Sequence, residues 1–195
     1  MMDMTMSMDH KKSGRIHPHK FTLWVAMGSI VMMFAGLTSA YVVRRNLANW
    51  LEFSLPKIFI ASTIVILTSS LTIHLALKSF KAREMQRYRT LIAITAFLGV
   101  VFAALQFVGF SDLHKQGVQL LGIGSNPSAS FLAIITGLHV LHVLGGVIAL
   151  LVIFLRAFFS RTKIYSPVSL EIVATYWHFV DILWIYLFVF FTWIG

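Results

Sequence analysis

The last hydrophobic segment of the chain carries two ionisable side chains that could do chemistry inside a membrane. It contains the run Tyr176-Trp177-His178-Phe179-Val180-Asp181-Ile182-Leu183-Trp184. A carboxyl group and an imidazole can exchange protons, hold a hydrogen-bonded contact or ligate a metal, and both are costly to place in hydrocarbon. On a helix Trp177, Asp181 and Trp184 share one face, and His178 lies beside Asp181. We therefore expect this helix to pack against protein.

A second pair of imidazoles, His139 and His142, lies in the preceding apolar segment, three residues apart and so on one helical face. At the helical rise per residue, His142 lies about 12 Å from the inner edge of the hydrocarbon core. The same rise places Asp181 about 13 Å and His178 about 9 Å from that edge. These similar depths predict a hydrogen-bonded contact between the two helices. We interpret the four residues as a structural polar cluster.

Two other interpretations of this cluster stay open. Asp181 and the histidines could relay protons or water, although no ladder of carboxylates continues across the membrane. Two histidines on separate helices could ligate haem iron, but His139 and His142 on one helical turn cannot supply opposite axial ligands to one haem. Since no closed set of metal ligands is apparent in the sequence, we assign no metal and no catalytic residue.

The composition is that of a polytopic membrane protein. Of the 195 residues, 58% are hydrophobic and 12% are charged, with a mean hydropathy of +0.82. The formal net charge of +9 does not indicate nucleic-acid binding, because the basic residues lie between the apolar segments. Cysteine is absent, which excludes disulfides, thiolate metal sites and thiol nucleophiles.

Five apolar runs are long enough to cross a bilayer, so we predict an all-α bundle of five transmembrane helices. No Lys, Arg or Glu interrupts them, and all prolines fall outside them. We expect two parts, a polar cytoplasmic N-terminal segment (residues 1–20) and a five-helix transmembrane domain (residues 21–195). The predicted helices are Phe21–Val43, Ile58–Leu77, Leu91–Phe110, Ser130–Leu155 and Ile172–Ile194.

The distribution of basic residues predicts the orientation. Twelve lie on one side of the predicted membrane: Lys11, Lys12, Arg15, Lys20, Lys78, Lys81, Arg83, Arg87, Arg89, Arg156, Arg161 and Lys163. Four lie on the other: Arg44, Arg45, Lys57 and Lys115. The richer side is expected to be cytoplasmic, which places the N-terminus inside and the C-terminus on the periplasmic or extracellular side. No cleavage site follows the first run and no presequence is evident, which favours a bacterial inner membrane.

Two further patterns predict contacts of the bundle. The pairs Gly36/Ala40, Gly99/Ala103 and Gly145/Ala149 have the small-xxx-small spacing of closely packed membrane helices. A basic cluster of Lys78, Lys81 and Arg83 at the inner surface is expected to bind the headgroups of anionic phospholipids.

The last two helices carry the residues of a known family. Glu171, followed by Ala174-Thr175-Tyr176-Trp177-His178-Phe179-Val180-Asp181 and Trp184, resembles the last helix of subunit III of haem-copper terminal oxidases. The run Thr136-Gly137-Leu138-His139-Val140-Leu141-His142-Val143 resembles the helix before it, and Trp24 to Arg44 is similar to the first helix shared by the family. The matching motif residues are Glu171, Tyr176, Trp177, Trp184, Thr136 and Gly137.

The resemblance implies a non-catalytic subunit of a bacterial oxidase that reduces oxygen to water and pumps protons. In this family haem and copper belong to subunit I, and subunit III packs beside it, binds phospholipid and protects the enzyme during turnover. The implied partners are subunit I, subunit II, membrane lipids and a respiratory supercomplex. The electron donor, cytochrome c or quinol, does not follow from this chain.

This chain departs from the family pattern at two places. Many members have a membrane glutamate at the position of Ile30, and an acidic residue where Val108 and Gly109 stand. These differences weaken a role as a proton antenna. Two other classes of protein remain as alternatives: a membrane b-type cytochrome that binds haem itself, and a small proton-coupled transporter using Asp181. A transporter predicts internal repeats, and the sequence has no detectable one.

Overall fold

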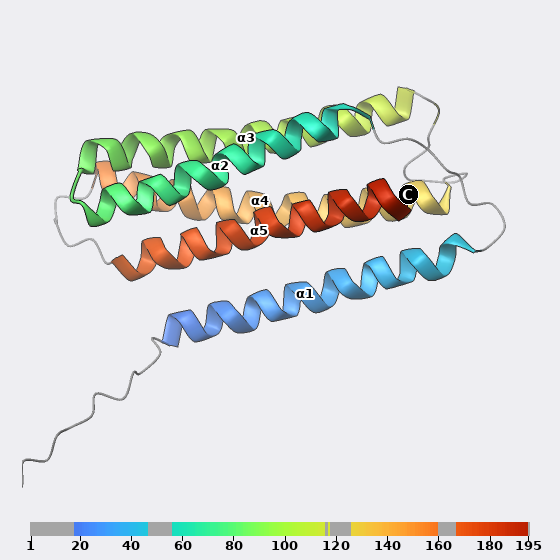
Figure 1. Ribbon diagram of the computed structural model, residues 1–195, viewed down its shortest axis with the longest axis horizontal. Helices are drawn as coiled ribbons and strands as arrows, with labels where there is room; N and C mark the ends of the chain where they lie inside the picture. Colours follow the sequence, from blue (N-terminus) through green and yellow to red (C-terminus); the bar gives the residue numbers. More distant parts are fainter. Residues whose placement is uncertain (1–17, 47–55, 116, 118–125, 160–166, 195) are drawn as a thin grey trace, which may run out of the picture.

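Each predicted apolar run forms one long helix. The computed structural model describes residues 18–46, 56–115, 117, 126–159 and 167–194. In these ranges all regular structure is helical, and each helix is long and apolar enough to cross a membrane. The helices are α1 (Pro18–Arg45), α2 (Ile58–Lys81), α3 (Met85–Lys115), α4 (Pro127–Phe159) and α5 (Pro167–Ile194), as Figure 1 shows. The predicted all-α, five-helix class is confirmed.

Local sequence explains where the helices begin and end. Pro18, Pro127 and Pro167 occupy first helical positions, where the missing N–H has no cost. The α2–α3 turn is closed by Arg83, whose φ of 60° is left-handed. The N–H of Glu84 then reaches the carbonyl oxygen of Ser79 at 3.0 Å, which completes a Schellman-type helix end.

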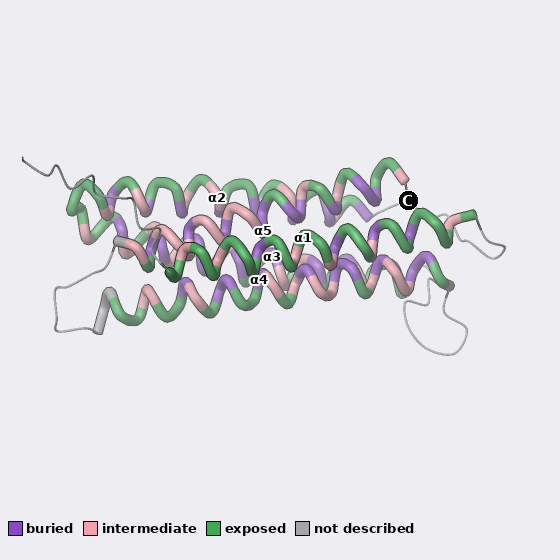
Figure 2. Tube along the Cα trace, turned by 90° about the horizontal axis from the view of Figure 1, so that it is seen from below, coloured by how far each residue is buried: buried purple, intermediate pink, exposed green. Residues whose placement is uncertain are grey.

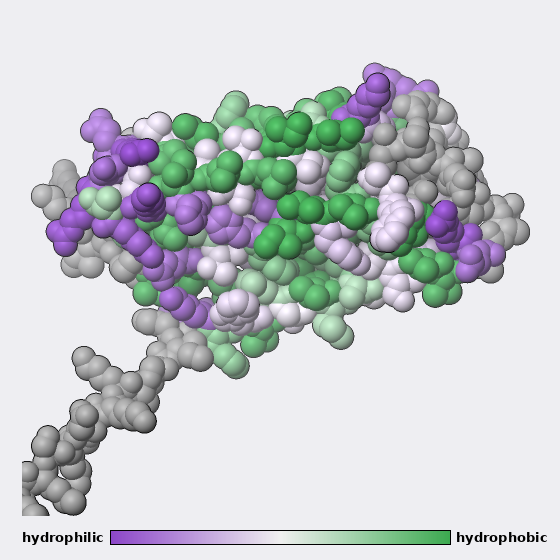
Figure 3. Space-filling view, in the orientation of Figure 1, coloured by the Kyte–Doolittle hydropathy of each residue, from purple (hydrophilic) through white to green (hydrophobic). Residues whose placement is uncertain are grey.

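Successive helices run in opposite directions, and more of the basic residues lie at one end of the bundle than at the other. One end, here called the basic end, holds the start of α1, α3 and α5 and the finish of α2 and α4 (Figure 1). Figure 3 shows hydrophilic side chains gathered at this end and a hydrophobic band over the middle of the bundle. Among the described residues, the backbone of α1 approaches those of α4 and α5 but not those of α2 and α3.

The buried residues recur mainly at spacings of three and four, most regularly on α2 and α4. This is the spacing of helices that cross at a shallow angle, as in a left-handed bundle. Figure 2 shows the buried positions on the inward sides of the helices, with exposed positions outside. The line on α2 is Phe59, Ser62, Ile66, Ser69, Ile73 and Ala76, and the line on α4 is Ala129, Leu132, Thr136, His139, Val143, Gly146 and Leu150.

Glycines on the inward lines allow the closest approaches. A Cβ atom added to Gly99 of α3 would lie 2.6 Å from the ring of Trp177, and one added to Gly146 of α4 would lie 3.0 Å from the same ring. The contact predicted at Gly99 is therefore present. At Gly36 and Gly145 an added Cβ would meet none of the described residues within 4 Å, so no close contact forms at these two glycines in the part of the chain that the structure describes.

Candidate functional site

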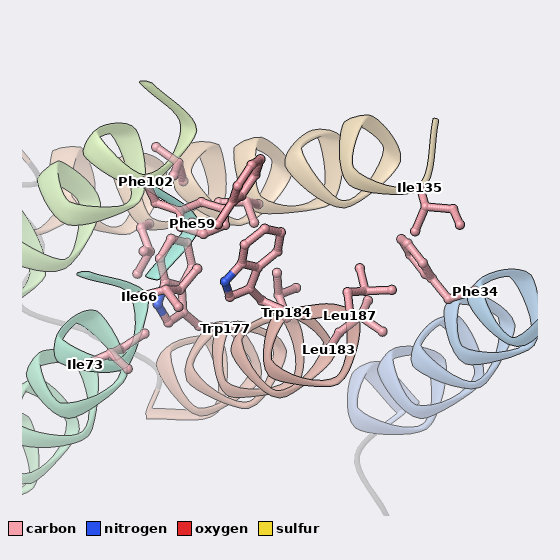
Figure 4. Close-up of a cluster of buried hydrophobic side chains, with 14 of the residues drawn as sticks. Phe34, Phe59, Ile66, Ile73, Phe102, Ile135, Trp177, Leu183, Trp184 and Leu187 are labelled. Atoms are coloured by element: carbon pink, nitrogen blue, oxygen red, sulfur yellow. The ribbon is translucent and has the colours of Figure 1, made fainter. Parts of the chain in front are cut away.

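The polar site is built on the inward face of α5. Trp177, Asp181 and Trp184 are 1%, 2% and 2% exposed, which confirms that they share a buried face. Figure 4 shows both indole rings projecting from α5 into the central apolar cluster. Trp177 Nε1 donates to Ser69 Oγ and Trp184 Nε1 donates to Thr63 Oγ1, each at 3.0 Å. These bonds fix α5 against α2.

Hydroxyl groups of α2 are the main polar partners of its neighbours, and sequence reasoning missed them. Gln106 Nε2 of α3 donates to Ser62 Oγ at 3.0 Å, and Thr72 Oγ1 lies 2.8 Å from Thr95 Oγ1. The sequence pattern that could have predicted these partners is the seven-residue spacing of Ser62 and Ser69, which places both on one helical line. In a membrane such buried serines mark the side that faces protein.

His139 occupies an aromatic cage. It is fully buried, and its ring lies 5.2 Å from the ring of Trp184, 5.9 Å from Phe102 and 6.4 Å from Phe34, measured between centroids. Neither ring nitrogen has a hydrogen-bond partner among the described residues. The imidazole therefore acts as a core ring that joins α1, α3, α4 and α5.

The hydrogen-bonded contact expected between His142 and the pair on α5 does not form. His142 Nδ1 lies 2.7 Å from the carbonyl oxygen of Leu138 on its own helix, and the ring packs 5.8 Å from that of Phe34. The link from α5 comes instead from Tyr176, whose hydroxyl donates to the backbone oxygen of His142 at 3.1 Å. The predicted hydrogen-bonded contact between the two helices is therefore present. The expected partners were wrong, because similar depth does not fix the direction in which a side chain points.

The ionisable residues of α5 turn toward α2. His178 is half-buried, and its Nδ1 lies 2.7 Å from Ser70 Oγ. Its ring also faces His74, with centroids 6.4 Å apart. The Ser70 hydroxyl lies near the carboxyl group of Asp181 as well, but without hydrogen-bond geometry, and both Asp181 oxygens lack a partner among the described residues. The four predicted cluster residues thus divide into two groups, one around Phe34 and one around Ser70.

Glu171 joins three helices at the basic end. Its carboxylate lies 2.9 Å from Lys20 Nζ of α1 and 3.4 Å from Lys81 Nζ of α2. Farther along α5, Tyr186 Oη lies 3.0 Å from Thr38 Oγ1 of α1. Because α1 has few neighbours, these two polar contacts hold it at both ends. Their pairing could not be read from the sequence, since residues 20 and 171 are far apart in it.

The remaining predicted residues lie at the helix surfaces or in the core. Thr136 is buried on the inward line of α4, whereas a Cβ atom added to the neighbouring Gly137 would meet none of the described residues within 4 Å. Lys78, Lys81 and Arg83 are all exposed at the basic end, and Lys81 also pairs with Glu171. Exposure permits the predicted lipid contact but does not test it.

The contacts of these histidine side chains are those of helix packing and not those of metal coordination. In the described ranges no group of three or more His, Asp or Glu residues converges as metal ligands do. His139 is enclosed by carbon, His142 is tied to its own backbone, and His178 is bonded to a serine. The fold and the site are those of a multi-pass membrane protein whose polar interior is arranged around tryptophan, serine and histidine.

Comparison with known proteins identifies the family. The sequence profile described as "Cytochrome c oxidase subunit III" matches residues 21–195. A probable cytochrome c oxidase subunit 3 from Nocardia farcinica is 33% identical over 89% of this chain and 90% of its own length. A probable cytochrome c oxidase subunit 3 from Mycobacterium tuberculosis is 31% identical over 90% of this chain and 91% of its own. The cytochrome c oxidase subunit 3 of Bacillus sp. PS3 is 26% identical over 85% and 80%, respectively.

The chain belongs to the cytochrome c oxidase subunit III family. It is a multi-pass membrane protein and, as a subunit III, a component of a complex with other subunits of a haem-copper oxidase.

Proposed function

We propose that this chain is a non-catalytic subunit that packs against subunit I of a bacterial haem-copper respiratory oxidase and stabilises it. The oxidase would reduce oxygen to water with proton pumping, using haem and copper held by subunit I. The observation that carries the proposal is that the polar groups of the interior bind one helix to another. Trp177, Trp184 and Gln106 each donate to a hydroxyl of α2, and His139 fills the core. Interior polar groups of this kind fix helix packing.

The proposal includes the placement of the chain in the membrane. The basic end is taken to face the cytoplasm of a bacterium, with the C-terminus on the opposite side, because basic residues favour the cytoplasmic side. The partners are subunit I as the main contact, subunit II and membrane lipids, within a respiratory supercomplex. Many large apolar side chains on the outside of the helices, such as Trp24, Met32, Phe97, Phe107 and Trp193, give the area that lipid and neighbouring subunits would cover.

Purification in mild detergent tests the subunit proposal. A tagged copy of the chain is expected to bring down a large membrane subunit with the visible spectrum of haem and with oxygen-reducing activity. The chain separated from that subunit is expected to show no haem spectrum. A haem spectrum from the separated chain would instead support the b-type cytochrome alternative. Recovery of the chain alone from membranes that contain active oxidase would contradict the proposal.

The same purified complex tests the proposed phospholipid contact at the basic end. Replacing Lys78, Lys81 and Arg83 together with glutamine should lower the amount of anionic phospholipid that remains with the complex. The reason is that each cation near a membrane surface contributes about 1 kcal/mol of attraction to anionic lipid. Phosphorus analysis and lipid mass spectrometry measure the change. The control replaces Arg44, Lys57 and Lys115, at the other end of the bundle, and an equal loss of lipid in both variants would reject the assignment.

A further inference from the structure

A pocket of about 360 Å³ enters the bundle from the basic end, between α1, α2 and α5. It exists because the backbones of α1 and α2 do not meet, so that part of α5 is left uncovered between them. Figure 3 shows hydrophilic surface reaching from this end toward the middle of the molecule. The residues of the pocket that bear on its chemistry are Lys20, Trp24, His74, Lys81, Glu171 and His178.

Polar groups continue from this pocket toward the centre of α5. Glu171, Thr175 and His178 follow one another at helical spacing along the pocket wall, and Asp181 comes one turn further on. His178 lines the pocket and bonds through Nδ1 to Ser70 Oγ at 2.7 Å, so its Nε2 is the nitrogen left for the pocket. Ser70 in turn stands beside the Asp181 carboxyl group.

Asp181 is the group that needs an explanation. It is 2% exposed, and neither of its oxygens has a hydrogen-bond partner among the described residues. A carboxylate left in this state is very costly in a bilayer, whereas a proton removes its charge.

We propose that the pocket, His178 and Ser70 form a route by which Asp181 binds and releases a proton on the membrane face at the basic end. A proton from pocket water binds His178 Nε2. Nδ1 gives its proton to Ser70 Oγ, and the Ser70 hydroxyl gives its own proton to a carboxylate oxygen of Asp181. The result is one proton moved from water to the carboxyl group, with His178 left as the other neutral tautomer.

The surroundings make this a proton-binding site rather than a channel. Beyond Asp181 the inward face of α5 continues with Trp184 and Leu187, which are buried in the apolar cluster. The charged and titratable groups that face the route are Lys20 on α1, His74 and Lys81 on α2, and Glu171 on α5. On α4, His139 lies against Trp184 and His142 against Phe34, outside the pocket. The route therefore opens to one side of the membrane.

Infrared spectroscopy of the oxidase complex in its membranes tests the proposal. Transfer from H₂O to D₂O should shift a carbonyl band of a protonated carboxyl group, and this band should be missing in Asp181→Asn. Ser70→Ala should slow that shift by about tenfold, the change expected from the loss of one hydrogen bond of ordinary strength in the route. Thr68→Val is the matched control, because the one bond of Thr68 to the described residues lies within its own helix, and this variant should leave the rate unchanged.

Three results would overturn the proposal. One is that the unaltered complex has no protonated carboxyl band that disappears in Asp181→Asn. Another is a band that does not shift in D₂O, which would mean that the carboxyl group is sealed. The third is equal exchange in Ser70→Ala and Thr68→Val, which would mean that protons reach Asp181 by another way. The amount of the chain retained in each complex is measured first, so that loss of the subunit is not mistaken for slow exchange.

Discussion

Replacing Trp177 with alanine is expected to cause the largest loss of stability of any single change in the bundle. The side chain is 1% exposed, and its ring fills the space beside Gly99 and Gly146. Removing a buried ring of this size costs about 3–5 kcal/mol, because a cavity remains. The change also leaves the Ser69 hydroxyl without its indole donor. The expected result is a chain that unfolds or leaves the complex at a clearly lower temperature.

The measurement is the fraction of the chain that stays with the oxidase after heating in detergent. Trp193→Ala is the matched control, since Trp193 is 85% exposed and its loss opens no cavity within the chain. Trp177→Phe removes the bond to Ser69 together with the outer ring atoms that pack beside Gly99. It should therefore cost more than the net value of one hydrogen bond, about 1 kcal/mol, and less than the alanine variant. An equal loss for Trp177→Ala and Trp193→Ala would show that the packing described here does not stabilise the subunit.

The number and the approximate bounds of the helices could be predicted from hydropathy alone. In hydrocarbon every backbone N–H and C=O must be paired within the segment, so a long apolar run has little choice but to form a helix. The prolines at positions 18, 127 and 167 then mark the starts of α1, α4 and α5. These are local properties, which is why the sequence suffices for them.

The rotation of each helix about its axis was harder to predict. In a soluble bundle the apolar stripe marks the inside, but here the lipid-facing side is equally apolar. Phe97 and Phe107 face outward, whereas Ser62, Gln106 and Asp181 face inward. The reliable signal is therefore the line of small and polar residues, and it correctly placed Trp177 and Asp181 on the buried side of α5.

The predicted cluster of four residues failed because depth and direction are separate quantities. His139 lies on the inward line of α4, but His142 lies beside that line and turns toward Phe34 of α1. His178 likewise leaves the inward line of α5 and reaches Ser70 of α2. A rise per residue gives the height of each side chain, and only the arrangement of neighbouring helices gives its partner. That arrangement depends on contacts between residues far apart in the chain.

Adding a single methyl group at Gly99 is expected to destabilise the bundle, although alanine is the better helix former. A Cβ atom there would lie 2.6 Å from Trp177 Cη2 and 2.7 Å from Val147 Cγ2. Trp177 cannot withdraw, because its ring also touches Gly146 and is bonded to Ser69. Overpacking of this kind costs about 1–3 kcal/mol, which exceeds the gain of about 1 kcal/mol in helix propensity. Gly99→Ala should therefore lower the temperature at which the chain leaves the oxidase.

The cause of this loss can be separated from a general effect of the substitution. Gly145→Ala adds the same methyl group where nothing lies within 4 Å, so it should cost nothing within the chain. Combining Gly99→Ala with Trp177→Phe removes the ring atoms that clash, and the double variant should lose less stability than the two single losses added together. Strict additivity would contradict the proposed contact between α3 and α5. Destabilisation by Gly145→Ala alone would instead support a neighbouring subunit on that face of α4, because none of the described residues of this chain lies within 4 Å of the new methyl group.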